Sequence, residues 1–62
     1  LVMFIDITDL NSIKKINTTR DVDGFYLLEI IFDNDHVMVY GFPNLKEFVF
    51  GYTKFMNKYR GR

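Results

Sequence analysis

Two apolar runs separated by a short polar segment are the feature that most constrains the fold of this chain. The runs "FYLLEIIFD" (25–33) and "HVMVYGF" (36–42) are rich in β-branched and aromatic residues, and the acidic "DND" segment joins them. This pattern is typical of a β-hairpin, because Asn and Asp tolerate the backbone of tight turns. The sequence therefore predicts a hairpin with Asn34 and Asp35 as a two-residue loop.

That loop would fix which residues face each other across the two strands. Phe32 is then opposite Val37, and Ile30 is opposite Val39, because directly opposed residues share one face of the ladder. The predicted core face consists of Tyr26, Leu28, Ile30, Phe32, Val37 and Val39. The other face consists of Phe25, Leu27, Glu29, Ile31, Met38, Tyr40 and Phe42. A strand exposed on one side alternates apolar with polar residues, so this second, mostly apolar face is expected to be covered by upstream strands or by a partner.

The upstream segment has one ambiguous element. "VMFIDI" (2–7) is predicted to be a strand, and "SIKKINTTR" (12–20) is either a strand joined to the hairpin by "DVDG" or a short helix begun by Thr8. The spacing of three between Ile13 and Ile16 favours a helical turn, whereas the polar residues 17–19 and the Asp-Gly pair favour a strand. We prefer the strand.

The segment "LKEFVFGYTKFMNKY" (45–59) has the spacing of an amphipathic helix. Pro43 ends the preceding strand, and Asn44 is suited to cap the first turn. The residues predicted to pack on the sheet are Leu45, Phe48, Val49, Tyr52, Phe55, Met56 and Tyr59. Gly51 is placed at the polar edge, or else admits another backbone at close range. Phe50 is expected on the exposed side, four residues from both Lys46 and Lys54.

Together these elements predict a single α+β domain spanning residues 1–62, with a small antiparallel β-meander of three or four strands packed against one C-terminal helix. The layout is similar to that of many small bacterial and phage proteins, including small flagellar-motor-associated proteins, and no function or site follows from it. The use of residues with AT-rich codons suggests a low-GC bacterium or its phage as the source. A chain of 62 residues without cysteine buries only about 60% of its unfolded surface, so we expect marginal stability.

The chain shows no convergent set of residues for catalysis or metal binding. "DVDG" begins like an EF-hand loop, but Phe25 and Phe32 fall where that loop requires oxygen ligands. His36 is expected at an open hairpin tip, and Glu29 is the one acid on a partly apolar face. The sequence therefore predicts a protein that is not an enzyme and has no cofactor and no metal site.

Charge is unevenly distributed along the chain. Residues 1–35 carry seven acidic and three basic side chains, and residues 36–62 carry one acidic and five basic ones, although the net charge is zero. One hypothesis is therefore a nucleic-acid-binding accessory protein that uses the basic C-terminal end. Its residues are Lys54, Lys58, Tyr59, Arg60 and Arg62. The alternative is a solvated helix end, where the positive side chains interact favourably with the negative end of the helix dipole.

The hypothesis we favour is a small non-enzymatic protein-interaction module that regulates or inhibits a larger host protein. A phage or mobile element is its candidate source. Apolar surface beyond the needs of one core usually marks an interface. The partner-binding residues predicted from the sequence are Phe50, Lys46, Lys54, Tyr40 and Met38. A homodimer is expected, and a structural homo-oligomer subunit is the third alternative. The opening apolar run of five residues is too short for a membrane span, so we expect a cytoplasmic protein.

Overall fold

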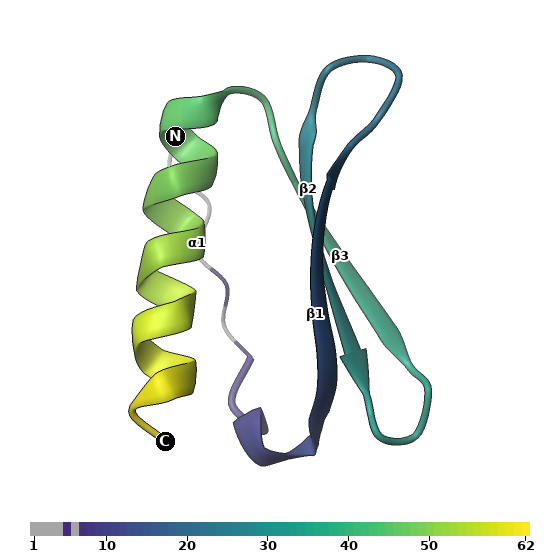
Figure 1. Ribbon diagram of the computed structural model, residues 1–62, viewed down its shortest axis with the longest axis vertical. Coiled ribbons are helices and arrows are strands. Elements are labelled where there is room, and N and C mark those ends of the chain that lie inside the picture. Colours follow the sequence, from purple (N-terminus) through teal and green to yellow (C-terminus); the bar gives the residue numbers. More distant parts are fainter. Residues whose placement is uncertain (1–4, 6) are drawn as a thin grey trace.

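The computed structural model describes residue 5 and residues 7–62, which form a small α+β fold with one sheet and one long helix (Figure 1). The three strands are antiparallel in the order β1-β2-β3, and the helix packs on one face of the sheet. The fold class predicted from the sequence is therefore confirmed. The elements in chain order are a 3-10 helix η1 (Leu10–Ser12), β1 (Ile13–Arg20), β2 (Tyr26–Phe32), β3 (Val37–Phe42) and α1 (Leu45–Arg60).

The segment 12–20, for which the sequence allowed a strand or a short helix, contains strand β1. A bulge explains the spacing of three between its apolar residues Ile13 and Ile16. Ile13 pairs with Phe32, but the next pair in register is Lys15 with Ile31, so one extra residue is accommodated in β1. A bulge of this kind lets Ile13 and Ile16 both face the core although three positions separate them. The predicted strand over residues 2–7 lies mainly outside the described residues, and Ile7 belongs to no strand.

The turn between β1 and β2 depends on Asp21 and Gly24. Asp21 Oδ1 accepts hydrogen bonds from the amides of Asp23 (2.9 Å) and Phe25 (3.1 Å). Gly24 has a φ of +87°, a backbone conformation that residues other than glycine rarely adopt. The "DVDG" segment therefore serves the backbone geometry of a turn.

The turn between β2 and β3 differs from the prediction by one residue. The Phe32 amide donates to the His36 carbonyl (2.9 Å), and the Asp35 amide donates to the Phe32 carbonyl (2.8 Å). The loop therefore contains residues 33–35, with Asp35 in the left-handed region at a φ of 68°. This is the geometry of a three-residue hairpin loop, a turn followed by one left-handed residue.

A shift of one residue exchanges the two faces of β3. Ile30 is opposite Met38 and Leu28 is opposite Tyr40, so Met38, Tyr40 and Phe42 point toward the helix. The predicted pairings of Phe32 with Val37 and of Ile30 with Val39 are wrong. Glu29 is opposite Val39. The placement of the even-numbered residues of β2 in the core is confirmed, since Leu28 and Ile30 are fully buried.

Helix α1 begins as predicted, but it is rotated relative to the expected packing. The Asn44 side-chain oxygen accepts from the Glu47 amide (2.9 Å), so the cap is confirmed. Gly51 is buried, and it was predicted at the polar edge, whereas Leu45 and Val49 are half exposed and were predicted to pack. The rotation turns the flank that carries both Gly51 and Lys58 toward Ile7, whose carbonyl accepts a hydrogen bond from Lys58 Nζ.

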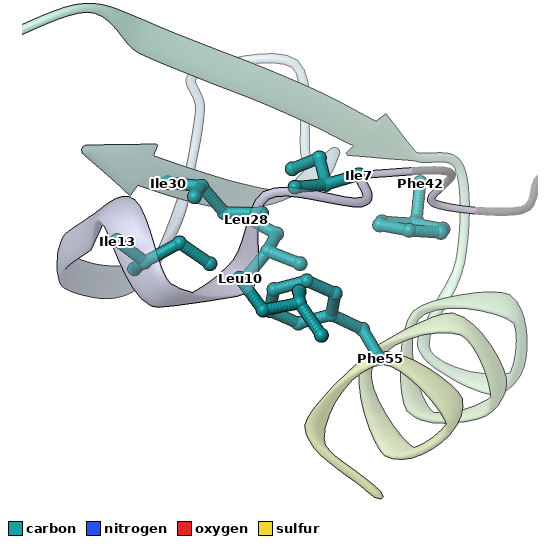
Figure 2. Close-up of a cluster of buried hydrophobic side chains, with 7 residues drawn as sticks. All are labelled: Ile7, Leu10, Ile13, Leu28, Ile30, Phe42 and Phe55. Atoms are coloured by element: carbon teal, nitrogen blue, oxygen red, sulfur yellow. The ribbon is translucent and has the colours of Figure 1, made fainter. Parts of the chain in front are cut away.

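The core lies between the sheet, the helix and the segment that precedes β1. Phe55 extends from α1 toward Leu10 and Leu28, and Ile7 lies beside Phe42 at the end of β3 (Figure 2). Phe48 stacks on Tyr26 and Tyr52, with ring centroids 5.5 Å apart in each pair. Residues 7–12, which we call the N-terminal segment, therefore contribute to the core between the sheet and the helix.

Candidate functional site

The side of α1 that faces away from the sheet combines exposed apolar residues with lysines. Phe50 is 45% exposed and Val49 is 50% exposed, although both are large apolar side chains. The Lys54 ammonium lies 5.3 Å from the centroid of the Phe50 ring, within the range of a cation–π contact. Lys46 lies one turn before Phe50 on the same side. We call Lys46, Val49, Phe50 and Lys54 the outer helix surface.

An open hollow of about 530 Å³ lies at the N-terminal end of the outer helix surface. Its wall is formed by Lys46, Val49 and Phe50 together with Asn44 and Glu47. The capping bond from the Glu47 amide to Asn44 fixes the backbone beneath the hollow. The surface therefore offers an aromatic side chain and an aliphatic one beside two cations on a rigid helix. This combination suits a partner surface that has an apolar centre and acidic neighbours.

The structure separates the five residues predicted to bind a partner into two groups. Phe50, Lys46 and Lys54 share the outer helix surface, as the sequence predicted. Met38 and Tyr40 point to the helix side of the sheet, where Tyr40 is half buried and packs against the core and Met38 is 43% exposed. The cause is the register of β3, which turns these two residues inward.

The face of the sheet opposite the helix is apolar along β2 and β3. Phe25, Val37 and Val39 are between 46% and 55% exposed, and Leu27 and Ile31 are half buried. Phe25 and Leu27 lie over Gly41, since a Cβ built there would be 3.9 Å and 3.6 Å from their side chains. We call this surface the outer sheet face. Its residues are Lys15, Asn17, Thr19, Phe25, Leu27, Glu29, Ile31, Val37, Val39 and Gly41.

Sequence reasoning did not place Val37 and Val39 on this exposed face, although a signal for it exists. A two-residue hairpin loop favours Asn-Gly or Asp-Gly, and no glycine follows Asn34. The segment "DND" therefore fits a three-residue loop better than a two-residue one. That choice places Val37 and Val39 on the outer sheet face.

The basic C-terminal residues are largely engaged within the domain. Lys58 Nζ donates to the Ile7 carbonyl (3.2 Å), and Arg62 Nε donates to Asn11 Oδ1 (3.1 Å). The Arg62 guanidinium also lies 4.2 Å from the centroid of the Tyr59 ring, and that ring stacks on Phe55 at 6.2 Å. Three of the five residues predicted to contact nucleic acid thus hold the C-terminal end of α1 against the N-terminal segment.

A second hollow, of about 320 Å³, lies beside the β2–β3 turn and includes Asp9, Asp33 and His36 in its wall. Asp35 lies in the same turn, but its carboxylate pairs with Lys14 Nζ at 3.0 Å. Across residues 5 and 7–62, no cluster of three or more His, Cys, Asp or Glu side chains is placed to hold a metal ion. The hollow therefore gives no support to a metal centre.

Comparisons with known proteins add no further constraint on this chain. In the part of the chain that the structure describes, no helix is long and apolar enough to cross a membrane. No protein-family model, curated protein or solved structure matches the sequence or the fold.

Proposed function

We propose that this protein is a small non-enzymatic interaction module that regulates or inhibits a larger partner protein through the outer helix surface. The observation that carries the proposal is the exposure of Phe50 beside Lys54 on the side of α1 away from the core. Phe50 is not among the residues of the described core. The exposed part of this aromatic side chain is a surface that a partner can cover.

The chemistry of the outer helix surface indicates how a partner would bind. Burial of an aromatic side chain such as Phe50 contributes about 1.5–3 kcal/mol, which is the scale of an interface hot spot. Lys46 and Lys54 flank the ring and favour a partner whose contact surface is acidic. Long lysine side chains also place their methylene groups along the aromatic ring, so they add apolar contact as well as charge. The partner we infer is an acidic protein surface with an apolar pocket.

Met38 and Tyr40 lie outside the outer helix surface, so the proposal depends on Phe50, Lys46 and Lys54. The helix packs on one face of the sheet, and the outer sheet face is the opposite one. The outer helix surface and the outer sheet face are therefore on opposite sides of the fold (Figure 1). A partner bound at α1 therefore leaves the outer sheet face open.

The test begins with a photo-crosslinking amino acid at position 50 and, as control, at position 22. Val22 is an apolar residue that is fully exposed in the turn between β1 and β2, distant from α1 in the sequence. A partner crosslinked from position 50 and not from position 22 is then purified, and its dissociation constant is measured with wild-type protein and variants. The partner's own activity is titrated with the wild-type protein, because a regulator must change it.

Phe50→Ser is expected to weaken binding by tenfold or more, which corresponds to about 1.4 kcal/mol. The matched control Val22→Ser should leave the dissociation constant unchanged. The double variant Lys46→Glu/Lys54→Glu should lower the association rate and its dependence on salt. Equal binding of wild type and Phe50→Ser would contradict the proposal. So would salt-sensitive binding of single-stranded DNA that depends on Lys54 and Arg60.

A further inference from the structure

The outer sheet face carries both apolar residues and charges in an ordered array. The register places Lys15, Ile31 and Val37 in one row across the three strands. The adjacent row contains Asn17, Glu29 and Val39. Side chains in both rows point away from the helix, because residues paired across antiparallel strands share a face.

Lys15 and Glu29, the two charged residues of this face, form no ion pair with any residue among 5 and 7–62. Glu29 is half buried among Leu27, Ile31 and Val39, yet the described residues provide its carboxylate with no ion pair. Lys15 is exposed and is likewise without an ion pair among them. A half-buried carboxylate on an apolar surface gains most from a cation that arrives together with the apolar group that covers the surface.

We propose that the outer sheet face binds a second copy of this chain, with the two sheets packed face to face. The two-fold axis would lie parallel to both sheets and at right angles to the strands, midway between the two rows. Each row then meets the other row of the second copy, so that Val37 is opposite Val39 of the second copy. Lys15 lies over Asn17 of the second copy, one strand away from Glu29 of the second copy. By symmetry, the dimer then contains two pairs of Val37 with Val39 and two ion pairs of Lys15 with Glu29, each between the two copies.

The charge pattern favours a second copy over an unrelated protein. The face carries one cation and one anion at positions that this two-fold axis brings together, so the surface is complementary to itself. The formal net charge of zero also means that two copies do not repel each other at long range. Because the pairs form between copies, one type of chain provides every group that the interface needs.

The size of the face predicts a weak dimer. Three strands about 4.8 Å apart and about seven residues long cover roughly 14 by 23 Å, which is small beside the typical 800 Å² per partner. The dimer should therefore dissociate on dilution and form at high protein concentration. Sedimentation of the full chain should show a mass that rises from 7.4 kDa toward twice that value as the concentration increases.

The test compares single and compensating charge changes on protein shown to be folded by circular dichroism. Lys15→Glu and Glu29→Lys should each raise the dissociation constant of the dimer by about fivefold to tenfold. The double variant Lys15→Glu/Glu29→Lys should restore it, because the two-fold axis again brings opposite charges together. Val39→Lys, at a residue 55% exposed in the monomer, should abolish the dimer. Phe50→Ser is the matched control and should leave it unchanged.

Several outcomes would overturn the inference. These are a chain that stays monomeric at every concentration, a dimer that Phe50→Ser dissociates, and a dimer that Val39→Lys leaves intact. Loss of a different protein partner in Val39→Lys, with the wild-type chain monomeric, would assign the face to that partner and equally overturn a second copy. The inference is independent of the proposed function, because Phe50 tests one surface and Val39 the other.

Discussion

Phe32 and His36 close the β2–β3 hairpin, with the Phe32 amide donating to the His36 carbonyl at 2.9 Å. This bond makes the loop three residues long and requires Asp35 to take a left-handed backbone with a φ of 68°. The side chains of Met38, Tyr40 and Phe42 then face the helix, and Val37 and Val39 face away from it. The residues that β3 contributes to the outer sheet face are set by this one turn.

Substitution of Asp35 tests the left-handed turn. Asp35→Val should lower the free energy of unfolding by about 1–2 kcal/mol, because a β-branched residue is strained at positive φ. Asp35→Asn is the control, since Asn tolerates this conformation and loses only the exposed ion pair with Lys14, worth at most about 1 kcal/mol. Urea unfolding followed by circular dichroism measures both. An equal loss in the two variants would contradict the role of backbone strain.

Gly24 and Gly41 form a second matched pair. Gly24→Ala should destabilise the protein by about 1 kcal/mol, because its φ of +87° strains any residue with a Cβ. Gly41→Ala should be neutral or slightly stabilising, since its Cβ would meet Leu27 at an ordinary 3.6 Å in a strand. Thermal unfolding of the two variants separates these effects. A greater loss in Gly41→Ala than in Gly24→Ala would show that the β1–β2 turn is not the strained one.

Phe55 and Phe50 lie on the same helix with opposite roles. Phe55→Ala should cost about 3–5 kcal/mol, because the ring is 2% exposed at the centre of the core, and a domain of this size would unfold. Phe50→Ser should cost much less than Phe55→Ala, because the ring is 45% exposed and lies outside the described core. Circular dichroism at 25 °C is sufficient to compare them. Unfolding of Phe50→Ser would mean that the helix is covered on its outer side as well.

Lys58 and Arg60 test whether the basic helix end is structural. Lys58→Ala should lower the free energy of unfolding by about 1 kcal/mol, because the part-buried bond to the Ile7 carbonyl is lost. Arg60 is exposed, so Arg60→Ala should change the free energy of unfolding by less than about 0.5 kcal/mol. Chemical denaturation measures the difference. If the two variants behave alike, the bond between Lys58 and Ile7 does not hold the N-terminal segment in place.

Much of the fold could be predicted from local sequence patterns. The hairpin, the Asn44 cap, the helix after Pro43 and the exposure of Phe50 follow from turn chemistry and helical periodicity. The grouping of Phe50 with Lys46 and Lys54 follows from helical spacing. These features involve residues within a few positions of one another, so sequence alone determines them.

The remaining features were decided by tertiary structure. Both faces of the hairpin are apolar, so alternation along β3 cannot distinguish one register from the next, and the backbone of Asp35 made the choice. The bulge in β1 let Ile13 and Ile16 share a face despite their helical spacing. Contact between Lys58 and Ile7, far apart in sequence, accompanies the burial of the Gly51 flank and the exposure of Val49. The bulge and the rotation of the helix depend on which distant surfaces meet, and a local pattern carries no information about that. The register of β3 instead depends on the length of the loop that Asp35 closes.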